Sequence, residues 1–195
     1  MDSTSLFGIL IASLLINNIL LIRFIALCSF FGVSNQMETS IGMGMAVIFV
    51  MMMASAVSWL IYYFLLVPFD LVYLRTASFI LTIAALVQLE EMYLKKYVPT
   101  LYRAMGIYLP LITTNCAVLA VAFLNIDYNY NFMQSMVYTF GVSAGYTLAI
   151  ILFAGIRERI ALAPVPKALQ GYPIAFFTAS LMSLAFLGFK GLFGL

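Results

Sequence analysis

Long apolar stretches alternate with short charged segments along the whole chain. A helix needs about 20 mostly apolar residues to cross the hydrocarbon core of a bilayer. Six stretches come close to this length when Arg23 is treated as an interruption within the first and Arg75 as an interfacial residue of the third. We therefore expect six membrane-spanning helices, which lie within the segments 3–37, 39–69, 71–89, 104–126, 128–156 and 168–189.

The composition supports this interpretation. Of the 195 residues, 65% are hydrophobic and only 8% are charged, whereas a soluble domain carries roughly 25% charged residues. Most of the surface must then face lipid or other protein. The expected fold class is an all-α integral membrane protein, and residues 1–195 form a single membrane domain. The net charge of +2 includes no basic patch, so no nucleic acid is expected as a partner.

The basic residues set the expected orientation, because cytoplasmic loops are enriched in Lys and Arg. If the six helices alternate in direction, the loops after helices one, three and five lie on one side of the membrane. Those loops carry six basic residues, and the opposite side carries two. We expect the first group in the cytoplasm and both termini outside; the two groups are Lys95, Lys96, Arg103, Arg157, Arg159 and Lys167, against Arg75 and Lys190.

The two halves of the chain share a weak pattern. The first expected helix contains LLINNILLI and the fourth contains LITTNCAVL, so a polar cluster interrupts each of them. Each of these helices is followed by two more, which gives two three-helix repeats over about 1–97 and about 98–195. An odd number of helices per repeat inverts the second repeat, as in transporters whose interrupted helices meet near the midplane. The clusters are Asn17 and Asn18, and Thr113, Thr114 and Asn115.

Polar side chains at this depth must face protein or water, because an unpaired amide in hydrocarbon costs free energy. Two interpretations stay open for these clusters. They can join helices through hydrogen bonds, or the helices can break there and open a cavity for a cofactor or an ion. Two other features invite packing roles. Gly42 and Ala46 form a small-xxx-small face, and Arg23 should pair with a backbone carbonyl or with a partner's carboxylate.

The chain has two cysteines and no histidine. The absence of histidine excludes bis-histidine haem ligation and ordinary histidine-based zinc sites. Cys28 and Cys116 each follow a polar cluster, and they can be apolar filler, a disulfide or metal ligands. Two thiolates are half of the ligand set of an iron–sulfur cluster, which needs about four. A cluster here would require two further cysteines from a partner chain.

Four segments carry a family resemblance: NNILLIRFIALCSFFGVS, YLPLITTNCAVLAVAFLN, AGIRERIALAPVPKALQG and FFTASLMSLAFLGFKG. They are similar to the family that contains the A subunit of the Rnf complex, the paralogous E subunit, and the D and E subunits of the sodium-translocating NADH:quinone reductase. The likeness covers nearly the whole chain. The stretches LVYLRT and IRERIALAPVP favour the A subunit of Rnf over the E subunit of the quinone reductase, which is the nearest alternative.

This resemblance implies a bacterial cytoplasmic-membrane subunit of a complex that couples electron transfer between ferredoxin and NAD to transport of Na⁺ or H⁺. In the family, the A and E subunits form a pair of opposite topology, and each gives two cysteines to one intramembrane [2Fe–2S] cluster. The corresponding ligands here are Cys28 and Cys116. The resemblance implies the E, B, C, D and G subunits as partners, with flavins and further iron–sulfur clusters held by other subunits. Activity is expected only of the complex.

Two alternatives remain from other classes of protein. In a secondary transporter with inverted repeats, the broken helices would form a substrate site, and replacing both cysteines with alanine would leave activity intact. In a purely structural subunit, the Asn and Thr side chains would only join helices, and substitutions in the polar clusters would lower assembly without changing any redox signal.

Overall fold

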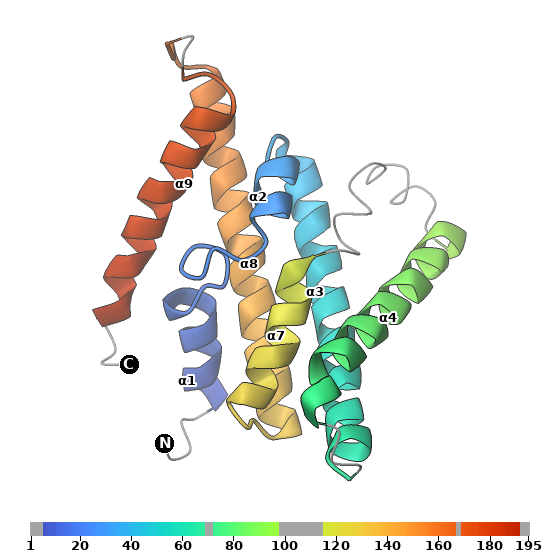
Figure 1. Cartoon of the computed structure of the whole chain (residues 1–195). Helices are drawn as coiled ribbons and strands as arrows, with labels where there is room; N and C mark the ends of the chain where they lie inside the picture. The colour runs from blue at the N-terminus through green and yellow to red at the C-terminus, as the bar shows by residue number, and fades with distance from the viewer. Residues whose placement is uncertain (1–5, 69–71, 98–114, 167–168, 192–195) are drawn as a thin grey trace.

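The computed structural model describes residues 6–68, 72–97, 115–166 and 169–191, and these residues contain helices and no strand. The predicted all-helical fold is confirmed in that part of the chain. Figure 1 shows the arrangement. In chain order the elements are α1 (Leu6–Ile11), η1 (Ala12–Ile16), α2 (Leu27–Val33), α3 (Met37–Ile61), η2 (Tyr62–Leu66), η3 (Val72–Leu74), α4 (Arg75–Tyr97), α7 (Cys116–Asp127), α8 (Phe132–Ala161), α9 (Tyr172–Leu187) and η5 (Gly188–Gly191).

Two helices are long and apolar enough to cross a membrane by themselves: Met37–Leu66, which joins α3 and η2, and Phe132–Ala161, which is α8. They correspond to the second and fifth predicted spans. Four shorter apolar helices fall in the other predicted spans, over Leu6–Ile16, Arg75–Leu89, Cys116–Asp127 and Tyr172–Leu187. The two long helices are apolar around most of their circumference, which is the pattern expected where lipid and protein share the surface.

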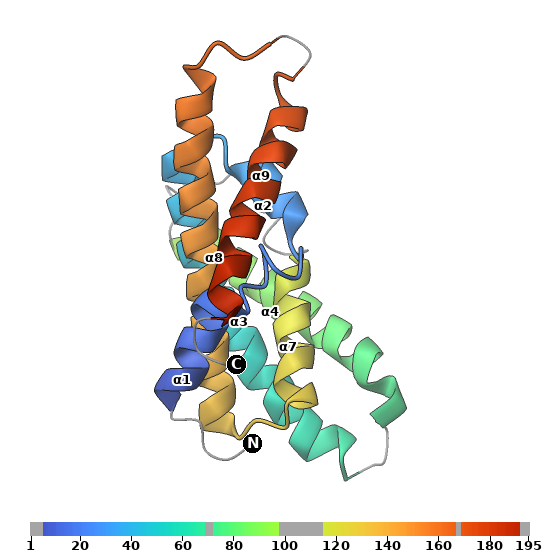
Figure 2. The ribbon, with the colours of Figure 1, turned by 90° about the vertical axis from the view of Figure 1, so that its left-hand side faces the viewer.

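Helices α3 and α8 pack against each other along much of their length and form the centre of the bundle. The α1–η1 helix packs on α8, while α7 and α4 pack on α3. Figures 1 and 2 show that α1 rises only to about the middle of the bundle and that α7 begins at about the same level. The end of the first helix and the start of α7 therefore lie at about the same level of the bundle.

Glycines on α8 allow the first helix to approach closely. A Cβ atom on Gly145 would lie 2.7 Å from the carbonyl oxygen of Leu14, and one on Gly141 would overlap the Ser13 hydroxyl. The two glycines are four residues apart in GVSAG, the small-xxx-small spacing of close helix contacts in membranes. Our expectation for Gly42 was wrong for the described part of the chain, where no atom of another segment lies within 4 Å of a Cβ atom built there. The neighbouring Gly44 makes the close contact instead, against Thr147 of α8.

We expect Gly145→Ala to destabilise the fold and Gly42→Ala to leave it unchanged. The added methyl group at Gly145 would meet backbone, which cannot rotate away, and overpacking of this kind typically costs about 1–3 kcal/mol. Thermal unfolding of the two detergent-solubilised variants measures the difference. Equal midpoints for the two variants would show that the α1–α8 contact is looser than the structure has it.

Candidate functional site

The first helix is broken in the middle of the bundle, as the sequence predicted. Regular helix ends at Ile16 and resumes at Leu27. Asn18 is fully buried and holds this break together: its amide donates to the Gly145 carbonyl on α8 at 2.8 Å. Its Oδ1 accepts from the backbone N–H groups of Leu20 (3.0 Å) and Leu21 (3.3 Å). The side chain thus replaces backbone hydrogen bonds that a continuous helix would have made.

Of the two asparagines in this cluster, only Asn18 has such a role. Asn17 is exposed at the end of η1, and its hydrogen bond runs through its backbone N–H to Ala12. The sequence alone could not show which of the two asparagines is buried, since they are the same residue type at adjacent positions. The rotation of the first helix about its axis decides which one faces α8, and this rotation is set by the close contacts with Gly141 and Gly145.

The backbone that follows the break adopts an unusual conformation. Phe24 and Ala26 have φ angles of +53° and +70°, in the left-handed region that residues other than glycine rarely occupy. Such residues cost on the order of 1–3 kcal/mol and persist only where the surroundings fix them. Ala26 is buried, and its N–H group donates to the Sγ atom of Cys116 at 3.1 Å. The strained segment of the first helix therefore contacts a cysteine from the second half of the chain.

Helix α7 begins directly after the second polar cluster. Asn115 is its N-cap residue, and the Asn115 Oδ1 accepts from the backbone N–H group of Ala117 at 3.1 Å. This cap explains why helical structure starts at Cys116. Thr113 and Thr114 lie outside the described residues, as does the segment 98–114, so the expected interruption of helix four stays a prediction on its N-terminal side.

The fold brings the two cysteines together, although 88 positions separate Cys28 from Cys116. Cys28 lies in the first turn of α2 and Cys116 is the first residue of α7. Both are exposed free thiols rather than a disulfide. They lie on neighbouring segments, because Ala26, two residues before Cys28, donates its N–H group to the Cys116 sulfur. Cys116 is the first residue of α7, so the positive end of the helix dipole is adjacent to it.

Behind the cysteines lies a buried polar layer centred on Tyr146 of α8. The Tyr146 hydroxyl donates to the Ser29 Oγ at 2.8 Å, and Ser29 in turn donates to the Ala26 carbonyl at 2.9 Å. The Nδ2 of Asn115 is buried and has no hydrogen-bond partner among the described residues. A donor of this kind beside Cys116 is suited to a group that brings its own acceptor atoms.

These residues fit half of an iron–sulfur site. Two neighbouring exposed thiols, a backbone N–H donated to one sulfur and a helix N-terminus are the features that stabilise ligating thiolates. The described residues contain no group of three or more Cys, His, Asp and Glu side chains that could hold a metal. Since the whole sequence has two cysteines, the remaining thiolates of a four-cysteine cluster would come from another chain.

Arg23, in the broken first helix, and Arg75, at the start of α4, both have partners near the C-terminal end of α7. Arg23 donates to the Tyr128 hydroxyl at 2.8 Å rather than to a backbone carbonyl. The other predicted partner of Arg23, a carboxylate of a partner chain, stays a prediction. Arg75 forms a 2.9 Å ion pair with Asp127 and lies over the Phe123 ring. Both contacts fasten the second half of the chain to the first at one end of α7.

A second buried polar cluster, centred on Asn125, was not predicted from the sequence. The Asn125 amide donates to Ser55 (2.7 Å) and Thr139 (3.0 Å), and Ser55 lies 3.5 Å from Ser135. These residues join α3, α7 and α8. Single small polar residues in apolar helices are the signal that could have indicated them, since such side chains hydrogen-bond across membrane helices. The cluster fixes the register of α7, and therefore the position of Cys116 at its start.

Comparisons with known proteins show to which family of membrane proteins the chain belongs. A family model described as an Rnf-Nqr subunit, membrane protein, matches residues 6–193. Similar relatives include the A subunit of the Na⁺-translocating ferredoxin:NAD⁺ oxidoreductase complex of Acetobacterium woodii, at 56% identity over 96% of this chain and 98% of the relative. The A subunit of the ion-translocating oxidoreductase complex is 55% identical in Photorhabdus laumondii, over 97% of this chain and 98% of the relative, and 58% identical in Serratia proteamaculans, over 93% and 94%.

The chain is thus a helical membrane subunit of the kind found in ion-translocating oxidoreductases. It belongs to the Rnf-Nqr family. The resemblance to the A subunit of the Rnf complex, inferred from four segments of the sequence, is confirmed over nearly the full length.

Proposed function

We propose that this chain is the A subunit of an Rnf-type complex, which couples electron transfer between ferredoxin and NAD to transport of Na⁺ or H⁺. We further propose that Cys28 and Cys116 are two of the four ligands of an intramembrane [2Fe–2S] cluster shared with the paralogous E subunit. The observation that carries this proposal is that two free, exposed thiols lie at the starts of separate helices, α2 and α7, whose N-terminal ends are joined by the hydrogen bond from Ala26 to the Cys116 sulfur.

The residues of this chain would hold and tune such a group. Cys28 and Cys116 would bind iron, and the Ala26 N–H, which donates to the Cys116 sulfur, would stabilise its negative charge. The group itself supplies one-electron chemistry when bound. Tyr146 and Ser29 hold α2 in place from behind the cysteines. Because both thiols are exposed, the partner ligands approach from the outer face, next to an open apolar hollow lined by Leu27, Cys28, Phe31, Gly32, Tyr172 and Phe176.

The same contacts offer a route for coupling. A charge change at the thiolates acts directly on Ala26, whose backbone is strained and which belongs to the broken segment of the first helix. Electrostatic interactions are strong in the low dielectric of a membrane interior. Reduction of the bound group would therefore change the relative free energies of two arrangements of the broken helix. A shift between these arrangements can open or close a path for an ion.

We also propose the finer architecture of six spans in two inverted repeats, with both termini outside. In support, α1 ends and α7 begins at about the middle of the bundle, and each is followed by a long central helix, α3 or α8. The basic last turns of α4 and α8, with Lys95, Lys96 and Arg159, lie toward the same end of the molecule. The described parts of the fold thus agree with the charge asymmetry from which we oriented the chain.

Iron and acid-labile sulfide analysis of the purified complex tests the proposal. We expect the Cys116→Ser complex to contain about two irons and two sulfides fewer than the native complex, the content of one [2Fe–2S] cluster. Ala120→Ser, one turn further along α7, is the matched control and should retain the full content. An unchanged iron content in Cys116→Ser would reject this chain as a cluster ligand and favour the transporter alternative.

A further inference from the structure

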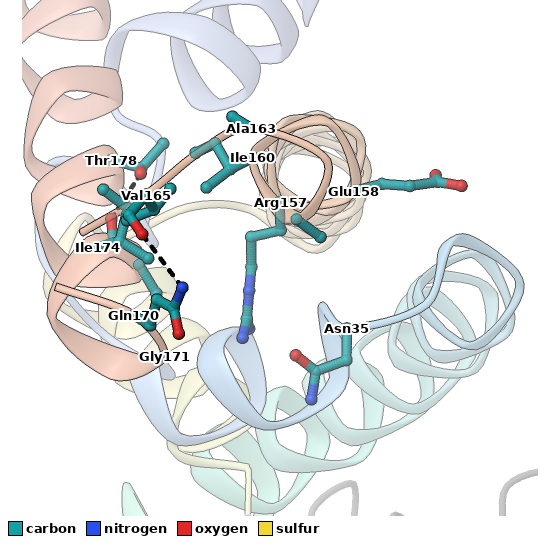
Figure 3. A pocket seen from close by; sticks show the side chains of 12 residues that line it. Asn35, Arg157, Glu158, Ile160, Ala163, Val165, Gln170, Gly171, Ile174 and Thr178 are labelled. Atoms are coloured by element: carbon teal, nitrogen blue, oxygen red, sulfur yellow. Dashed lines mark hydrogen bonds between the residues drawn. The ribbon is translucent and has the colours of Figure 1, made fainter. Parts of the chain in front are cut away.

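A cavity of about 500 Å³, which neither cysteine lines, lies at the end of the bundle where α8 and α9 are joined (Figure 3). Its walls come from the last turns of α8, the connecting segment, the start of α9 and the turn between α2 and α3. The residues that matter for its chemistry are Asn35, Arg157, Ala163, Gln170 and Thr178. The proposed electron-transfer function uses none of them.

Arg157 points into this cavity with part of its hydrogen-bonding capacity unused (Figure 3). Its Nη1 donates to the Phe31 carbonyl at 3.0 Å and to the Ser34 hydroxyl at 2.8 Å. The hydrogen bonds among the described residues engage neither Nη2 nor Nε, so a guanidinium edge is available to an incoming acceptor. Phosphate oxygens are well suited to such an edge, because the planar fork of arginine matches them.

The charge balance of the cavity favours an anion. Among the described residues, no carboxylate forms an ion pair with Arg157. Glu158 also borders the cavity, but Figure 3 shows its side chain directed away from Arg157. The amides of Gln170 and Asn35 add neutral polar groups on either side; the Gln170 Nε2 donates to the Val165 carbonyl at 3.1 Å, which fixes that side chain at the rim.

The depth of the cavity corresponds to the lipid headgroups. With 30 residues, α8 is about 45 Å long, whereas the hydrocarbon core is about 30 Å thick. Arg157 lies four residues before the end of α8, hence about 6 Å from it, in the interfacial region. On α9, an exposed apolar stripe leads from the level of the cavity toward the bilayer centre, formed by Phe177, Leu181 and Leu184. These side chains offer a surface for acyl chains below a headgroup.

We propose that this cavity binds the phosphate group of an anionic phospholipid, with the free edge of the Arg157 guanidinium as its principal contact. Basic pockets between membrane helices at the interface have the chemistry that anionic headgroups need. A soluble phosphate ion would satisfy the same guanidinium but would gain nothing from the apolar stripe on α9. The bound lipid fastens the α8–α9 connection to the α2–α3 turn, which Arg157 already contacts through Ser34.

The test uses the assembled complex, purified in detergent and depleted of lipid. Thermal unfolding is followed with added cardiolipin, with phosphatidylcholine and with inorganic phosphate, and bound phospholipid is counted by mass spectrometry. We expect cardiolipin to raise the unfolding midpoint by several degrees and the other two additions to leave it unchanged. Arg157→Gln should lose this shift and at least one tightly bound anionic lipid per copy of the chain.

Two further variants keep the test decisive. Arg159→Gln removes an equal charge two residues away, outside the cavity lining, and should respond to cardiolipin as the native chain does. Ala163→Trp fills the cavity without touching the Arg157 hydrogen bonds and should lose the response even if Arg157→Gln fails to fold.

A shift with inorganic phosphate alone would assign the site to a soluble anion and overturn the lipid assignment. A response kept in Ala163→Trp, or lost equally in Arg159→Gln, would overturn the site itself. Dissociation of another subunit from Arg157→Gln, without loss of lipid, would assign the cavity to a partner's acidic segment instead.

Discussion

Serine in place of Cys28 or Cys116 is expected to reduce ferredoxin-dependent NAD reduction by the assembled complex more than about 100-fold. Loss of an outer-shell partner of a metal site typically costs 10–100-fold, and loss of a ligand itself exceeds that. Ion uptake driven by this reaction should fall in parallel. Activity and ion uptake are measured together in membrane vesicles that contain the native or the variant complex.

The two cysteine variants should lose activity while the amount of assembled complex stays unchanged, because both thiols are exposed and make few packing contacts within the chain. The Ala120→Ser variant of α7 controls for a hydroxyl added near the site. If both cysteine variants transport ions at native rates, electrons do not pass through this chain. The broken helices would then form a transporter site with the cysteines as filler, which is the second interpretation that the sequence allowed.

Leucine at Asn18 is expected to prevent stable insertion of the first helix in its broken form. The substitution removes the bond to the Gly145 carbonyl and leaves two backbone N–H groups, of Leu20 and Leu21, without acceptors. Each buried unsatisfied group costs about 1–3 kcal/mol. The sum is a large part of the stability of a typical domain, about 5–15 kcal/mol. Immunoblotting of membranes and size-exclusion chromatography of the solubilised complex would detect the loss.

Asn17→Leu is the matched control for this prediction. Asn17 is adjacent, has the same side chain and is exposed, with no side-chain hydrogen bond among the described residues. It should assemble to near-native levels. Equal losses in the two variants would mean that the polar character of the cluster matters and that the individual contacts of Asn18 do not.

The sequence predicted the helices and the first break because both follow from local chemistry. Uninterrupted apolar length specifies a membrane helix, and Asn17 and Asn18 mark a place where such a helix either opens or hydrogen-bonds to a neighbour. The predicted second span, 39–69, and fifth span, 128–156, agree with Met37–Leu66 and Phe132–Ala161 to within a few residues. A membrane helix is predicted from hydropathy and charge summed over many residues, so one atypical residue hardly changes the prediction.

Contacts between distant segments could not be predicted in the same way. Nothing in the local pattern shows that Ala26 donates to Cys116, or that Tyr146 lies behind both cysteines, because these depend on how helices rotate and pack. Gly42 illustrates the problem: its spacing to Ala46 matched a packing motif, but that face of α3 meets no neighbour at Gly42. The GVSAG stretch on α8 had the same spacing and does pack.

The proximity of Cys28 and Cys116 could be predicted from the sequence only in part. Two polar clusters, each followed by a cysteine, suggested a repeat, and an inverted repeat would bring the cysteines together at midplane. The structure brings the two thiols together through particular residues: Asn115 starts α7 at Cys116, and Ala26 links the first broken helix to it. A repeat indicates that two sites face each other, but capping and hydrogen bonding decide whether their sulfur atoms meet.

The central claim is that Cys28 and Cys116 together hold half of an iron–sulfur cluster. Its most direct test is the electron paramagnetic resonance spectrum of the dithionite-reduced complex, native against Cys116→Ser, with iron-replete samples and the Ala120→Ser variant alongside. The claim predicts a [2Fe–2S] signal in the native and control complexes that is lost in Cys116→Ser while the signals of clusters in other subunits persist. A [2Fe–2S] spectrum that is identical in all three complexes would contradict it.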